Sequence, residues 1–167
     1  GHVLPQNIEN SVVLLQQAAG LGDIDAMIFL GECFEKGDGV PQDKSKAFQL
    51  LQQASDLGNS DAIFSLALYY LNGDSVPQDK LKAIQLYQKA SDLGNIDAMN
   101  NLACFYLKGN GVPQDKSKAI QLVQKALNLG SIDAMFNLGV CYERGDGVPQ
   151  NKKKATQLIQ QAAELGH

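Results

Sequence analysis

The stretch VPQDK occupies residues 40–44, 76–80 and 112–116, and its variant VPQNK occupies residues 148–152. The prolines of these stretches, together with Pro5, are the five prolines of the chain, and each is separated from the next by 36 residues. A constant period of this length is typical of stacked helical repeats, because one helical pair cannot bury its own apolar face. We therefore predict an all-α fold, a right-handed α/α solenoid of 36-residue helix-turn-helix repeats.

The period divides the chain into one partial and four full units. The chain begins on a degraded copy of the motif, LPQN at residues 4–7. Gly1 and His2 have the look of an expression scar, so we expect the native N-terminus to be absent. We predict a single repeat solenoid over residues 1–167, whose partial and full repeats are 5–22, 23–58, 59–94, 95–130 and 131–166.

Each full unit has the pattern of two helices. In the first full unit, Asp23 is a residue type that caps helix starts, and Gly37 tolerates the left-handed conformation of a helix end. The second helix begins at Asp43, after a proline that fixes the entering chain. Its predicted buried stripe follows helical spacing and consists of Ala47, Leu50, Leu51, Ala54 and Leu57.

The repeated residues resemble the Sel-one-like repeat, a 36-residue relative of the tetratricopeptide repeat. The pattern recurs in all four full units and covers nearly the whole chain. Ser75 departs from it by replacing the second loop glycine of its unit. The resemblance implies an adaptor role in protein quality control, signalling or bacterium–host interaction. In the first full unit the pattern consists of Ala26, Leu30, Gly31, Phe34, Gly37, Gly39, Val40, Asp43, Lys46, Ala47, Ala54 and Gly58.

The composition argues against a nucleic-acid-binding or membrane-spanning protein. The chain has 14 Lys and Arg residues against 18 Asp and Glu residues, a net charge of −4, whereas a nucleic-acid binder is expected to carry a basic face. No apolar run approaches the roughly 18 residues that a membrane-spanning helix needs. We expect a soluble protein, and the sequence leaves open whether it is cytosolic or secreted.

The chain lacks the residue patterns of catalytic and metal sites. Its two histidines, His2 and His167, lie at opposite ends of the chain, whereas a Ser or Cys nucleophile needs a base beside it. Cys33, Cys104 and Cys141 lie in different units with no Cys-x-x-Cys pair. We interpret them as buried or half-buried apolar residues and not as zinc ligands. We expect no enzyme activity, no metal and no cofactor.

Four positions of the first helix of each repeat vary from unit to unit while the framework around them repeats; in the first full unit they are residues 28, 29, 32 and 35. In a solenoid of tetratricopeptide type, these positions lie on the side of the helix that lines the concave surface. Apolar side chains there would anchor an extended segment, and asparagine amides would hydrogen-bond its backbone. The alternative is that Phe64 and Phe136 pack between layers. The predicted partner-binding residues are Ile28, Phe29, Glu32, Phe64, Ser65, Leu68, Asn100, Asn101, Cys104, Phe136, Asn137 and Val140.

Two hypotheses of function follow from these patterns. The leading hypothesis is a protein–protein interaction adaptor that binds a peptide or protein segment in the concave groove. The alternative is a structural spacer of a longer repeat protein, with no binding of its own.

The partial repeat adds one expectation: Ile8, Val12 and Val13 leave apolar surface on the first helix, which favours self-association.

Overall fold

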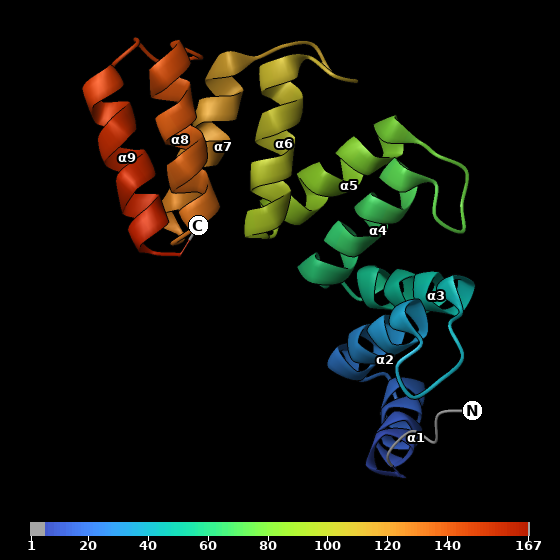
Figure 1. Cartoon of the computed structure of the whole chain (residues 1–167). Helices are drawn as coiled ribbons and strands as arrows, with labels where there is room; N and C mark the ends of the chain where they lie inside the picture. The colour runs from blue at the N-terminus through green and yellow to red at the C-terminus, as the bar shows by residue number, and fades with distance from the viewer. Residues whose placement is uncertain (1–5, 167) are drawn as a thin grey trace. The chain divides into compact units, whose positions relative to one another are not determined.

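A computed structural model describes residues 6–166 of the chain, with side chains described from residue 10 onward. This part of the chain contains nine α-helices and no strand (Figure 1). Each full repeat contributes two helices, which confirms the predicted all-α repeat fold. The helices are α1 (Gln6–Gly20), α2 (Ile24–Lys36), α3 (Lys44–Asp56), α4 (Ser60–Asn72), α5 (Lys80–Asp92), α6 (Ile96–Lys108), α7 (Lys116–Asn128), α8 (Ile132–Arg144) and α9 (Lys152–Glu164).

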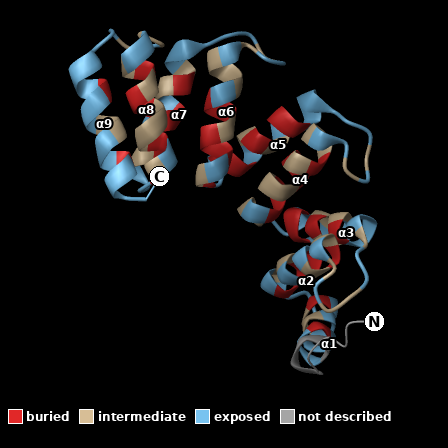
Figure 2. Ribbon diagram, in the orientation of Figure 1, coloured by how far each residue is buried: buried red, intermediate tan, exposed pale blue. Residues whose placement is uncertain are grey.

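The helices belong to two compact units, residues 1–86 and 87–167, and the division falls inside α5. Each unit has its own buried interior. Leu66 is among the most deeply buried side chains of the first unit, and Met99 and Leu102 are among those of the second. Buried residues (red in Figure 2) are numerous on α2 to α8 and sparse on α9. The predicted single solenoid over residues 1–167 stays a prediction.

The helix starts and ends predicted from the repeat are confirmed. Asp23 Oδ1 accepts a hydrogen bond from the Ala26 N–H at 2.8 Å, and α2 ends at Gly37 with φ of 81°. The second helix of the unit is capped in the same way, because Asp43 Oδ1 accepts the Lys46 N–H at 3.0 Å. These bonds satisfy amides that the first turn of a helix leaves without a partner. The equivalent caps of α4, α6 and α8 are Asn59, Asn95 and Ser131.

The glutamine of VPQDK has a structural role that the sequence did not reveal. Gln42 Nε2 donates a hydrogen bond to the backbone oxygen of Glu35 at 2.7 Å. Carbonyls in the last turn of a helix have no intrahelical partner, so this bond closes the end of α2 against the following loop. The equivalent bonds, at 2.7–2.8 Å, are donated by Gln78, Gln114 and Gln150.

The structure corrects two predictions about apolar residues. Leu57 was expected to be buried but is 57% exposed. The reason is that α3 ends at Asp56, so Leu57 lies past the end of the helix and does not continue its buried stripe. Val12 was expected to be exposed but is buried in the core of the first unit, while Val13 is exposed. The side chain of Ile8 lies outside the described residues. Self-association through α1 stays a prediction.

Candidate protein-binding surface

In the first unit, the predicted binding residues lie on α2 and α4. Phe29 is 58% exposed. Glu32 is exposed and pairs with Lys36 one turn later, with 3.4 Å between Oε2 and Nζ. Among the predicted binding residues of this unit, Phe29 presents an aromatic ring and Glu32 a paired carboxylate to solvent. The other four predicted residues are half-buried: Ile28, Phe64, Ser65 and Leu68.

Asn100 does not present its amide to solvent, contrary to expectation. It is 8% exposed, and its Nδ2 donates to Ser131 Oγ at 3.0 Å. The same Ser131 oxygen accepts the Ala134 N–H at 3.1 Å, so Asn100 ties α6 to the capped start of α8. A buried asparagine between two helices is a structural residue, and the structure does not bring it to an open surface.

Asn101 is half-buried on α6. Burial raises the pKa of the Tyr87 hydroxyl, and the Asn101 side chain partly offsets this rise. Asn101 stays a predicted binding residue.

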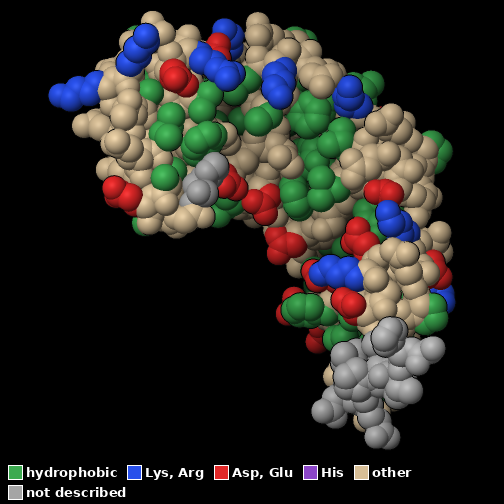
Figure 3. Space-filling model, viewed as in Figure 1, with side chains coloured by type: hydrophobic (Ala, Val, Ile, Leu, Met, Phe, Trp, Pro, Cys, Tyr) green, Lys and Arg blue, Asp and Glu red, His purple; other side chains and the backbone are tan. Residues whose placement is uncertain are grey.

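Three other predicted residues, Cys104, Asn137 and Val140, line one pocket of about 200 Å³ in the second unit. We call it the α6/α8 pocket. Phe136 is half-buried on α8 beside Asn137. Figure 3 shows hydrophobic side chains at the surface over α6 and α8, with Lys and Arg side chains above them. The pocket lining comprises Ala103, Cys104, Leu107 and Lys108 of α6, Val123 of α7, Asn137, Val140, Cys141 and Arg144 of α8, and Asp146 of the following loop.

The charged residues of this pocket were not among the binding residues predicted from the sequence. Lys108 and Arg144 are the last residues of α6 and α8. Asp146 follows α8, and its Oδ1 accepts from Lys116 Nζ at 2.7 Å. One difference between the repeats could have indicated these charged residues from the sequence. Lys36 stands four residues after an acid, whereas its counterparts Lys108 and Arg144 stand four residues after Cys104 and Val140.

The three cysteines differ in their surroundings. Cys104 is exposed, Cys33 is half-buried and Cys141 is buried, so the expectation of buried or half-buried thiols fails at Cys104. Burial raises the pKa of the Cys33 and Cys141 thiols, and nearby carboxylates raise both further. A raised pKa lowers the fraction of the reactive thiolate at neutral pH.

Alkylation is expected to distinguish these thiols. With N-ethylmaleimide at neutral pH, Cys104 should react first, Cys33 more slowly, and Cys141 only when the second unit opens, because access to the thiol falls in this order. Proteolysis and mass spectrometry of timed samples measure the three rates. Modification of Cys141 as fast as Cys104 in the folded protein would contradict the burial of Cys141.

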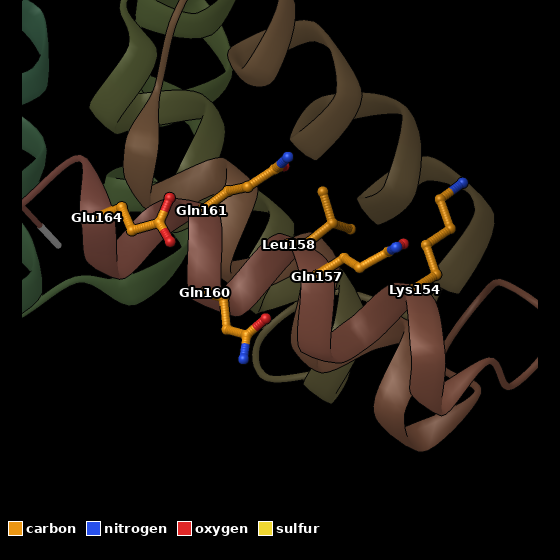
Figure 4. A pocket seen from close by; sticks show the side chains of 6 residues that line it. All are labelled: Lys154, Gln157, Leu158, Gln160, Gln161 and Glu164. Carbon is orange, nitrogen blue, oxygen red and sulfur yellow. The ribbon is translucent and has the colours of Figure 1, made fainter.

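A larger hollow lies over α9 but does not resemble a binding site. It has a volume of about 450 Å³, and the six residues along it all belong to one helix (Figure 4). Leu158 is the one apolar side chain among them; the others are Lys154, Gln157, Gln160, Gln161 and Glu164. A polar face of a single helix offers little to hold a partner, so the α6/α8 pocket is the better candidate.

The described part of the chain shows neither a metal-ligand cluster nor a membrane span. Among the described side chains, residues 10–166, nowhere do three or more His, Cys, Asp or Glu residues gather as ligands for a metal ion. None of the described helices combines the length and the apolar character that crossing a membrane requires.

Comparison with known proteins places the chain in a family. The model of the Sel1 repeat matches residues 1–23, 24–59, 60–95, 96–131 and 132–167. No curated protein matches the chain significantly.

Several solved structures share the fold. A Sel1 repeat protein from Oxalobacter formigenes is 30% identical with a TM-score of 0.88, over 94% of this chain and 64% of that one. The protective antigen c5321 of uropathogenic Escherichia coli, described as having an SLR fold, is 32% identical with a TM-score of 0.88, over 93% of this chain and 33% of that one. The immunity protein Pa5087 from Pseudomonas aeruginosa is 26% identical with a TM-score of 0.65, over 90% of this chain and 56% of that one.

The chain thus spans less than two thirds of the length of each of these proteins. The matches cover all of its repeats, and its residues 6–166 are entirely helical apart from loops. The Sel1 repeat fold is typically a non-enzymatic scaffold for protein interactions. The chain belongs to the Sel1 repeat family.

Proposed function

We propose that this chain is an adaptor in a bacterial signalling or host-interaction system. It binds a peptide or protein segment on the first helix of each repeat. Support for the setting comes from bacterial relatives, among them a protective antigen and an immunity protein. Support for the mode comes from the family, whose repeats generally act as interaction scaffolds.

The α6/α8 pocket carries the proposal. Its walls are apolar where Leu107, Val123 and Val140 contribute, and Asn137 adds an amide that can donate and accept hydrogen bonds. Apolar pockets with a few polar groups are where interface anchors are usually held. Two successive repeats form this pocket, so its shape depends on their stacking.

In the first unit, Phe29 is a second candidate contact. Its ring is largely exposed on α2, although folding favours burying aromatic surface. Aromatic side chains are enriched at protein interfaces, where they supply much of the binding energy. We therefore propose Phe29 as a separate contact site on the first unit.

Substitution of Val140 by Glu is expected to weaken partner binding strongly. The carboxylate would enter an apolar pocket, so capture of the partner should fall about tenfold or more, since truncating an interface anchor commonly costs 2 kcal/mol or more. Immobilised variants are incubated with lysate of the source organism, and bound proteins are quantified by mass spectrometry. Gln160→Glu is the matched control, because it adds the same charge on the exposed face of α9.

A milder variant, Asn137→Ala, guards against unfolding, and melting temperatures verify that all variants are folded. Partner capture that Val140→Glu and Asn137→Ala leave unchanged would contradict the placement of the site. If no protein were enriched over beads that carry an unrelated helical protein, the chain would be a spacer and the proposal would fail.

A further inference from the structure

The rim of the α6/α8 pocket carries two cations. Lys108 and Arg144 end their helices, both side chains are exposed, and both line the pocket together with apolar residues. A cation at the end of a helix is favoured by the helix dipole. That effect explains each residue separately, but it does not explain why an apolar pocket lies between the two.

These two cations lack the acid that the first unit provides. In α2, Lys36 pairs with Glu32 four residues earlier. At the equivalent positions of α6 and α8 the acid is replaced by Cys104 and Val140. Over the described side chains, residues 10–166, no carboxylate forms an ion pair with Lys108 or Arg144.

The one acid of the pocket is already engaged. Asp146 accepts from Lys116 Nζ at 2.7 Å, so its charge is balanced by a third cation. The chain as a whole carries a net charge of −4. The pocket is therefore a locally positive, partly apolar site on an acidic protein, and it suits a ligand that combines apolar surface with negative charge.

The volume of the pocket selects the size of the group that enters it. Sites for cofactors and small molecules commonly measure about 300–1,000 Å³, whereas this pocket measures about 200 Å³. A cavity of about 150 Å³ in another protein is large enough for benzene. One large apolar side chain, such as Leu or Phe, is therefore the fitting occupant.

We infer that the α6/α8 pocket binds an acidic peptide segment, in which a Leu, Ile or Phe side chain fills the pocket and neighbouring Asp or Glu carboxylates pair with Lys108 and Arg144. The inference rests on the proposed function and adds the chemistry of the partner. Asn137, beside the apolar wall, is placed to hydrogen-bond the backbone of the segment.

Selection from a displayed library of random 12-residue peptides tests the inference. The library is selected on the immobilised full chain, and the enriched peptides are synthesised with a fluorescent label for anisotropy titrations. The enriched peptides are expected to carry Asp or Glu next to a large apolar residue and to bind more weakly as salt is added. Bound peptide should also slow alkylation of Cys104 and leave that of Cys33 unchanged.

The charge variants provide the decisive comparison. Lys108→Gln with Arg144→Gln is expected to weaken binding about 5- to 20-fold, in line with two exposed ion pairs. Lys152→Gln with Lys153→Gln is the matched control, because it removes the same charge from exposed positions of α9 and should leave affinity unchanged.

The outcomes separate the two claims. If enriched peptides shield Cys104 but are not acidic, or bind the Lys108 and Arg144 variant as tightly as wild type, the inference on partner chemistry is overturned and the proposed binding site stands. If no enriched peptide shields Cys104, the peptide-binding function of this surface is overturned as well.

Discussion

Leu66→Ala is expected to lower the free energy of unfolding by about 2–5 kcal/mol. Leu66 lies in the middle of α4 and is 1% exposed within the core of the first unit. Truncation removes buried apolar surface and leaves a cavity, because the surrounding helices relax only in part. Urea unfolding followed by far-UV circular dichroism measures the loss.

Leu81→Ala is the matched control for this prediction. Leu81 lies in the first turn of α5 and is 63% exposed, so the same atoms are removed without emptying a core. Its stability should stay within about 0.5 kcal/mol of wild type. Wild-type stability in Leu66→Ala, or equal losses of unfolding free energy in the two variants, would contradict the burial of Leu66 in the core of the first unit.

The sequence predicts helix boundaries well because they depend on local chemistry. The side chain of Asp23 reaches an amide three residues away, and the left-handed conformation at Gly37 concerns a single backbone position. Neither requires knowledge of how two helices pack. Each local feature recurs every 36 residues, so a helix boundary that is wrongly assigned in one repeat stands out when it is compared with the equivalent residues of the other repeats.

Contacts between helices are not visible in the same pattern. Lys118 Nζ lies 4.4 Å from the centroid of the Tyr106 ring and donates to its hydroxyl at 2.7 Å. Asn100 reaches Ser131, 31 residues later. A repeat alignment places equivalent residues together, but it does not tell which residue of one helix meets which residue of the next. The expectation of an open amide at Asn100 failed for this reason.

The cysteines illustrate information that the alignment contained. Cys33 and Cys141 occupy the same repeat position, whereas Cys104 stands one position earlier, at the position of Glu32. One residue turns the side chain by about 100° around a helix. Cys104 is accordingly exposed on the pocket rim while Cys141 is buried. The three thiols therefore differ in exposure, although each lies on the first helix of its repeat.

Gly147→Ala is expected to lower the free energy of unfolding by about 2–5 kcal/mol, the sum of a left-handed backbone cost and a steric clash. Gly147 has φ of +72°, and a Cβ atom there would lie 2.6 Å from the backbone oxygen of Lys116 and 2.8 Å from Ile120 Cγ1. Both atoms belong to α7, whose first turn the loop after α8 contacts. The clash would push this loop away and weaken the pair between Asp146 and Lys116.

Gly130→Ala separates the two contributions. Gly130 has φ of +89° with nothing within 4 Å of an added Cβ, so only the backbone cost of about 1–2 kcal/mol applies. Ser75 occupies the loop position equivalent to Gly147 and has φ of 58°, which shows that this conformation alone is compatible with a side chain. The excess loss in Gly147→Ala therefore measures the approach of the loop to α7, and equal losses in urea unfolding of the two variants would mean that the loop does not pack there.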